Sequence, residues 1–231
     1  MNAAAPLWAV NAVLAPVFKG VRHVFEKGSI TVIVTGSDHN CVMLLDSFLG
    51  IHGAGEESAV LLGKEVGKLS KKELREIRSR IGVYIHECGL ISNLKAVENV
   101  TLPLLCNSTE STREIFEKAL QALNRAGYDG DPFMPPGRLS EIQRATVSLA
   151  RVFASDMELV IYDRLGDGLQ EDEQETLVGL ALDFHQERPD RTTVFLFPNP
   201  LAIFGNTPAT VLHLSEEGSN ENGAGSPLQA P

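Results

Sequence analysis

The sequence predicts an α/β fold with a parallel β-sheet covered by helices. Short apolar, β-branched runs that suit buried strands alternate with segments of helical periodicity along most of the chain. The chain has 231 residues, of which 43% are hydrophobic and 22% are charged, so it can bury a sizeable core. Together these observations favour one large globular domain, or one domain with an attached lobe.

The first part of the chain predicts a β edge, then a strand, a turn and a helix. Residues 1–16 are apolar but lack the basic segment of a signal peptide, so we favour a first strand at a sheet edge. Residues 21–25 alternate like a strand, and residues 29–35 (SITVIVT) predict a buried strand. After the turn GSDHN, the segment CVMLLDSFLG has the apolar spacing of a helix that ends at its glycine.

The middle of the chain predicts a hairpin, a charged helix, another strand and then a helical lobe. Residues 51–66 are typical of a glycine-rich turn and hairpin, and residues 81–86 predict a strand. Between them, Ser70 and Glu73 have the spacing of a helix capping box. The lobe lies between strands and combines NLKAVENVTLPLL, the amphipathic segment 111–127 and the proline-rich segment 132–137.

From Arg138 onward, helices and strands alternate again. A helix (SEIQRATVSLARVFAS) precedes a buried strand (MELVIYD), and a second helix (DEQETLVGLALDFHQE) precedes a strand (TTVFLF) and a short strand near TVLHLSEEG. This alternation favours a parallel sheet. The small, polar residues 217–231 predict a disordered tail.

Charge and cysteine content exclude several classes of protein. The 20 Lys and Arg against 30 Asp and Glu give a formal net charge of −10, so we expect no nucleic-acid partner. Cys41, Cys88 and Cys106 have no CxxC spacing and predict neither a zinc site nor a disulfide framework, which is consistent with a reducing cytoplasm. Because no apolar run is long enough to cross a membrane, we expect no direct membrane insertion.

Two stretches of the sequence match one known family without a gap. KELREIRSRIGVYIHECGLISNLKAVENVTLPL has the layout of the Q-loop segment, and LSEIQRATVSLARVFASDMELVIYD has that of a signature motif followed by Walker B. Over about residues 9–216 the chain resembles the ATP-binding subunit of an ABC transporter, especially the compact subunits of lipid or lipoprotein export systems. This resemblance implies a nucleotide-binding domain over residues 1–216, with a P-loop NTPase-like (RecA-like) core, an antiparallel β edge and an inserted helical subdomain at about 88–146.

The resemblance places unusual residues in the loop that binds phosphate in this family. Such a Walker A loop needs glycines, a lysine for the β- and γ-phosphates, and a hydroxyl for Mg²⁺. In the matching stretch TGSDHNCVM, Cys41 stands in place of the lysine and Val42 in place of the hydroxyl. The degenerate loop also contains Gly36 and Ser37, with Asp38 and Asn40 at glycine positions.

The strand-end motifs depart from the family pattern in the same way. Asp163 ends the strand LVIYD and matches the carboxylate that holds Mg²⁺ through water, but Arg164 stands where the catalytic glutamate is expected. An arginine cannot accept a proton at neutral pH, so it cannot act as a general base. His86 stands at the Q-loop glutamine and Asn199 at the switch histidine.

The signature motif retains its serine and glutamine but lacks the two glycines between them. Ser140 and Gln143 remain, but Glu141 and Ile142 replace two glycines where backbone would meet a nucleotide across a dimer interface. For Ser140 and Asp163 we favour a structural interpretation, a helix N-cap and an acid at a strand end. We expect no metal ion, and Asp163 is the candidate for Mg²⁺ only if nucleotide binds.

Asp38 brings a carboxylate to the start of a helix. We hypothesise that it caps the free N–H groups and occupies the anion site from within, so that the loop stays folded without nucleotide. The alternative is that Asp38 points into solvent from a turn.

The combined substitutions predict a pseudo-ATPase without a bound cofactor. One lost electrostatic donor costs about two to three decades of rate, and a lost general base roughly two to four. We therefore expect a scaffold or regulator of a membrane transport complex. The alternatives are an ATP- and Mg²⁺-binding ATPase whose atypical site a partner completes, and a protein-interaction module released from transport.

The resemblance also implies partners and a location. A membrane permease subunit is expected to dock between His86 and Leu105, which would hold the chain at the cytoplasmic face of the membrane. The chain is expected to form a homodimer, or a heterodimer with an active ATPase subunit. A lipid or lipoprotein cargo is implied by the resemblance in size and middle segment.

Overall fold

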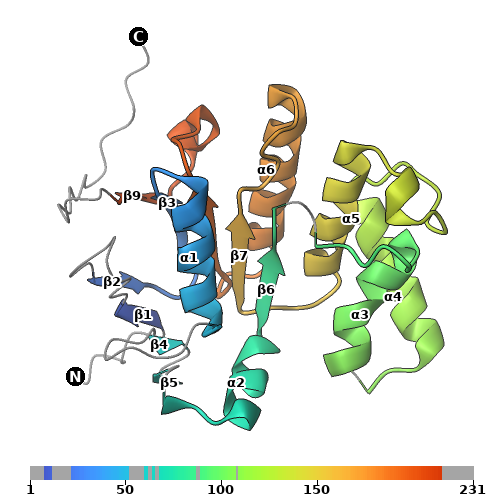
Figure 1. Cartoon of the computed structure of the whole chain (residues 1–231), viewed down its shortest axis with the longest axis horizontal. Helices are drawn as coiled ribbons and strands as arrows, with labels where there is room; N and C mark the ends of the chain where they lie inside the picture. The colour runs from blue at the N-terminus through green and yellow to red at the C-terminus, as the bar shows by residue number, and fades with distance from the viewer. Residues whose placement is uncertain are drawn as a thin grey trace.

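The protein is described by a computed structural model that covers residues 8–11, 22–51, 60–61, 64–65, 68–86, 89–107 and 109–214. At its centre lies a five-stranded parallel sheet in the order β6-β7-β8-β3-β9. Figure 1 labels β6, β7, β3 and β9 of this sheet. The strands are β3 (Ile30–Val34), β6 (Ile81–Tyr84), β7 (Leu159–Asp163), β8 (Thr192–Phe197) and β9 (Thr210–His213). The predicted parallel α/β core is therefore confirmed.

Helices cover both faces of the parallel sheet, which explains its apolar strands. Every residue of β3, β7 and β8 is buried, as expected for strands that helices cover on two sides. Ile161 of β7 packs in a cluster with Phe48 of α1 (Asp38–Leu49). The next residue, Tyr162, packs in the opposite cluster with Leu177 of α6 (Glu171–Gln186). Successive residues of one strand thus hold a different helix on each face.

A second, antiparallel sheet forms the predicted β edge, in the order β2-β1-β4-β5. Its strands are β1 (Trp8–Asn11), β2 (Arg22–Phe25), β4 (Val60–Leu61) and β5 (Lys64–Glu65). The pairing of β4 with β5 confirms the predicted hairpin. Helix α2 (Lys71–Arg78) follows, and its capping box between Ser70 and Glu73 is present as predicted.

Three helices form the predicted lobe beside the β6 edge of the parallel sheet (Figure 1). They are α3 (Ala96–Asn107), α4 (Thr112–Arg125) and α5 (Glu141–Phe153), and the short η2 (Pro136–Arg138) leads into the last. The fully buried Asn99 fixes the loop before α3, because its Oδ1 accepts from the Ile91 N–H at 2.7 Å. Since α5 continues to Phe153, this helix runs past the expected end of the lobe at 146.

The chain after β8 forms the short η3 (Ala202–Asn206) before β9. The predicted tail at 217–231 lies outside the described residues, as does Cys88. Within the described ranges, we find no helix with both the length and the apolar composition that a membrane span requires.

Candidate functional site

The loop after β3 leads directly into α1. Ser37 is the N-cap of α1, and its Oγ accepts a hydrogen bond from the Asn40 N–H at 3.2 Å. Gly36 has a φ of 79°, a left-handed conformation that glycine adopts without strain. Its N–H donates to the Pro198 carbonyl at 3.0 Å, which ties the loop to the end of β8. The predicted Walker A position is therefore a defined turn at the carboxyl edge of the sheet.

Polar side chains inside this loop bond to one another. The amide of Asn40 donates to the Thr35 carbonyl at 2.8 Å, and the Thr35 hydroxyl donates to the Ser37 carbonyl at 2.9 Å. The Cys41 Sγ lies 3.0 Å from the Thr35 Oγ1. Thr35 and Asn40 are both buried, so these contacts replace hydrogen bonds to water. Sequence reasoning missed this role of Thr35, although a polar residue directly after a buried strand was a usable signal.

Cys41 and Val42 present little polarity to the site. The Cys41 side chain is fully buried, and burial raises the pKa of its thiol to about 11, with the charge of Asp163 acting in the same direction. The thiol is therefore neutral at pH 7. Val42 is exposed and offers an isopropyl group rather than a hydroxyl.

Asp163 and Arg164 form an ion pair at the end of β7. Asp163 is 1% exposed, and its two carboxylate oxygens accept from Nε and Nη2 of Arg164 at 3.1 and 3.3 Å. The backbone N–H of His86 donates to the same carboxylate at 3.3 Å. Burial alone would lower the pKa of Arg164, but the hydrogen bond and charge of Asp163, with the charge of Asp38, raise it. Arg164 therefore remains a cation.

Asp38 does not cap α1, so that part of the sequence prediction is wrong. The N-cap is Ser37, and Asp38 is the first residue inside the helix. Both residue types are good caps, and the extended backbone of Ser37 decides which one takes the role. The Asp38 carboxylate instead lies 3.6 Å from Nη1 of Arg164.

The signature residues form the N-terminus of α5. The Ser140 Oγ accepts from the Gln143 N–H at 3.3 Å, and the Ser140 N–H donates to the Gln143 side chain at 3.1 Å. This capping box matches the structural interpretation of Ser140. The Glu141 side chain is 74% exposed, whereas Ile142 packs partly against the core.

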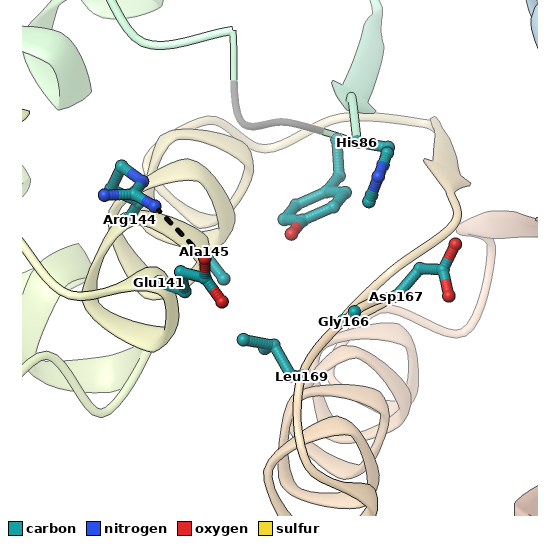
Figure 2. Close-up of a pocket in the computed structure, with 9 residues that line it drawn as sticks. His86, Glu141, Arg144, Ala145, Gly166, Asp167 and Leu169 are labelled. Carbon is teal, nitrogen blue, oxygen red and sulfur yellow. Dashed lines mark ion pairs between the residues drawn. The ribbon is translucent and has the colours of Figure 1, made fainter.

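A pocket of about 340 Å³ lies between α5 and the loop after β7. Figure 2 shows His86 across this pocket from Glu141 and Arg144, while Asp167 and Leu169 come from the loop. Cys41 and Val42 are not among the described residues that line this pocket. The predicted site residues thus gather in two places, the Arg164 ion pair and this pocket. Sequence reasoning missed Arg144 and Tyr84, which are not motif positions.

The predicted switch position, Asn199, lies outside both the Arg164 ion pair and the pocket lining. Asn199 follows β8 and is exposed. Within the part of the chain that the structure describes, no group of three or more His, Cys, Asp or Glu side chains is arranged to hold a metal ion.

Comparisons with known proteins indicate the family to which the chain belongs. A family model described as ABC transporter matches residues 18–164. The chain is 25% identical over 171 residues to the probable ribonucleotide transport ATP-binding protein mkl of Mycobacterium tuberculosis, covering 74% of this chain and 48% of that protein. It is 28% identical over 172 residues to the macrolide export ATP-binding/permease protein MacB of Mannheimia succiniciproducens, covering 74% of this chain and 27% of that protein. The chain thus spans about half the length, or less, of these relatives.

Solved structures share the fold. A dimeric ATP-binding cassette in a post-hydrolysis state with ADP and Pi has a TM-score of 0.78 and 22% identity, covering 91% of this chain and 92% of that chain. The cbiO1 protein from Clostridium perfringens, part of the ABC transporter complex cbiONQ, has a TM-score of 0.75 and 21% identity, covering 93% and 84%. Because the family model also matches more than half of the sequence, this chain belongs to the ABC transporter family and has the fold of its ATP-binding cassette.

Proposed function

We propose that this chain is a catalytically degenerate ABC ATP-binding subunit, a pseudo-ATPase that scaffolds or regulates a membrane transport complex. The observation that carries the proposal is the contact of Arg164 with Asp163. A guanidinium stands at the position that needs a proton acceptor, and it already pairs with the carboxylate that would serve Mg²⁺. The end of β7 therefore offers neither a general base nor a free carboxylate for Mg²⁺.

The residues of the site do not suit a magnesium nucleotide. Such a ligand requires oxygen donors for the metal and a cation that faces the phosphates. Cys41 offers a neutral thiol and Val42 an alkyl group, while Arg164 occupies the Asp163 carboxylate. Asp38 adds a negative charge at the helix start where phosphate would lie. We accordingly propose that the chain works without a nucleotide cofactor.

We further propose that a membrane permease subunit docks on the segment between His86 and Leu105. Three apolar side chains in or beside this segment are exposed, Ile85 at 39%, Ile91 at 43% and Leu105 at 54%. The relative MacB carries ATP-binding and permease functions in its name, which supports a permease as the partner. Docking there would hold the chain at the cytoplasmic face of a membrane.

The proposed assembly is a dimer beneath the permease, with either a second copy or an active ATPase subunit as the other half. A dimeric cassette among the similar structures supports this arrangement. The proposed cargo class is lipid or lipoprotein, and its support is the resemblance in size and middle segment. The curated relatives carry names for ribonucleotide transport and macrolide export, so their names do not select one cargo.

Equilibrium binding of a fluorescent ATP analogue tests the proposal. The isolated chain is titrated in buffer with Mg²⁺, beside an ATP-binding cassette that has an intact lysine and glutamate as positive control. We expect no saturation of this chain at analogue concentrations that saturate the control. Micromolar binding would contradict the pseudo-ATPase proposal.

A partner-completed ATPase remains the second candidate, because Asp163 and Ser140 are both retained. It predicts that the assembled complex loses ATP hydrolysis when Asp163 is replaced by Asn in this chain. Under our proposal hydrolysis by the complex matches that of a complex with the exposed Asp172→Asn control. Loss of hydrolysis in an Asp163→Asn complex that assembles to the same extent as the control would favour the second candidate.

A further inference from the structure

We infer that Arg164 is the built-in cation of this site, which joins Asp38 to Asp163 and keeps the loop after β3 closed around Cys41 when no nucleotide is present. The inference rests on the proposed function in one respect, namely that no magnesium nucleotide supplies positive charge here. Its test uses the chain without nucleotide. Failure of the ATP-binding proposal and failure of this inference are therefore distinguishable.

Three contacts place Arg164 between two parts of the chain. Its Nε and Nη2 contact Asp163 at 3.1 and 3.3 Å, and its Nη1 lies 3.6 Å from Asp38. Asp163 ends β7, whereas Asp38 begins α1. The guanidinium therefore links the carboxyl end of one strand to the first turn of a helix that follows another strand.

Burial makes this link more costly to break from one side than a surface ion pair. The Arg164 side chain is 12% exposed and Asp163 is 1% exposed, so their contact is shielded from water and salt. The Asp38 side chain is 64% exposed, so its contact with Arg164 is the weaker arm. Removing the guanidinium would leave a buried carboxylate without its counter-ion and a second carboxylate nearby.

The backbone of Arg164 supports the same interpretation. Its φ of 49° is the one positive value at a non-glycine residue within the described ranges. A side chain in this left-handed region costs about 1–2 kcal/mol, so surrounding contacts must hold it there. The Arg164 N–H donates to the Leu196 carbonyl of β8 at 2.9 Å, and its side chain makes the three contacts above. The position is thus fixed from both the main chain and the side chain.

Cys41 reports on the closed state of the loop. Its thiol is fully buried and contacts Thr35; the charge of Arg164 lowers its pKa, whereas the charges of Asp163 and Asp38 raise it. Faster alkylation after loss of Arg164 therefore cannot come from a lower pKa of the thiol. If Arg164 holds the loop closed, alkylation of Cys41 requires local opening. Alkylation is measured with iodoacetamide and read by mass spectrometry on the peptide that contains Cys41, so the other cysteines do not interfere.

We expect Arg164→Ala to increase the alkylation rate of Cys41 by about tenfold or more, because the buried Asp163 carboxylate then faces Asp38 without a counter-ion. Arg164→Lys should restore part of the protection, because lysine keeps the charge but not the planar fork. Low-millimolar guanidinium chloride should restore protection to Arg164→Ala, whereas equal sodium chloride should not. A role that was only steric would not produce this difference between the two salts.

Two further variants keep the test decisive. Asp38→Asn removes the exposed arm alone and should raise alkylation by a smaller factor than Arg164→Ala, even though loss of the Asp38 charge also lowers the pKa of Cys41. Arg113→Ala removes an exposed arginine that pairs with Glu117 on α4, and it should label at the wild-type rate. The inference is overturned if folded Arg164→Ala and Asp38→Asn both label at the wild-type rate, or if guanidinium and sodium act alike.

Discussion

At the scale of single residues, the Cys41 thiol couples the site to pH. Its folded-state pKa of about 11 is above the ordinary value of 9.0 because the side chain is buried. The unfolded chain therefore loses this proton first as pH rises. The stabilisation that results is fully present below pH 9 and is lost as pH rises through about 11.

We predict that Cys41→Ser makes the free energy of unfolding less sensitive to alkaline pH. Serine keeps a hydroxyl near Thr35 but does not titrate in this range. Relative to its value near neutral pH, the wild-type protein should lose up to about 2 kcal/mol more than the variant by about pH 11. Urea unfolding of both proteins at several pH values measures this difference. Parallel pH profiles would show that Cys41 does not titrate as described.

The sequence indicated which residues occupy the motif positions of the site, but it did not indicate which side chains contact one another. Spacing alone located Cys41, Val42 and Arg164 relative to the family motifs. The contact of Arg164 with Asp38 depends on how two loops meet after the sheet has formed, and a linear pattern does not encode side-chain direction. The cap was expected at Asp38 rather than at Ser37 because these adjacent residues are equally suitable N-cap types.

At the scale of elements, the N-terminus of α5 gives a direct test of what Ser140 does. Ser140 and Gln143 form a capping box, and Ser111 and Glu114 form a matching one at α4. We predict that Ser140→Ala lowers the free energy of unfolding by about 1 kcal/mol, as Ser111→Ala should. Urea unfolding of the two variants provides the comparison. A neutral Ser140→Ala beside a destabilising Ser111→Ala would contradict the capping role.

The end of α4 is fixed to the core by Arg125. Its guanidinium lies 4.9 Å from the ring centroid of Phe153 and 4.5 Å from that of Phe184, and it pairs with Glu187 after α6. Phe153 ends α5 and Phe184 belongs to α6. One side chain thus connects the lobe to a helix that covers the parallel sheet.

We predict that Arg125→Ala loosens α4 and lowers the free energy of unfolding by about 1–2 kcal/mol. Arg113→Ala in the same helix should cost roughly 0.5 kcal/mol or less, because its ion pair with Glu117 is exposed. Hydrogen exchange along α4 and urea unfolding measure the two effects. Equal protection of α4 in both variants would argue against a connection through Arg125.

Element types followed from the sequence more readily than element ends. The apolar pattern located α1, but the helix begins at Asp38, before the first apolar residue of that pattern. Its start is set by the hydrogen bond to Ser37, which apolar spacing does not report. The buried role of Asn99 was equally hidden, because its partners are backbone groups of a preceding loop.

At the scale of the whole molecule, the sequence predicted a parallel sheet but not the order of its strands. Alternating strands and helices imply parallel pairing, whereas the position of β3 between β8 and β9 depends on how the crossovers run. The antiparallel sheet was suggested by resemblance and by the hairpin pattern. The order of the strands depends on how the helices pack on the two faces of the sheet, and local periodicity does not specify this packing.

We predict that millimolar Mg-ATP leaves the melting temperature of the isolated chain unchanged. A ligand with micromolar affinity at that concentration would stabilise the folded state by about 4 kcal/mol, which corresponds to a rise of roughly 10 °C for a domain of this size. Differential scanning fluorimetry with and without Mg-ATP measures the shift, with Mg²⁺ alone as control. A rise of several degrees that requires ATP would contradict the proposed absence of nucleotide binding.

The contact of Arg164 with Asp38 has a consequence for the order of folding. Arg164 follows β7 and Asp38 begins α1 after β3, and strand β8 lies between these two strands. The two residues are also far apart in the sequence. Closing such a distant contact costs chain entropy until β3, β8 and β7 have paired. We therefore expect the ion pair to form after the folding barrier, so that Asp38→Asn speeds unfolding and leaves the folding rate unchanged. On this expectation the ion pair slows unfolding, whereas the folding rate is set by pairing of the strands.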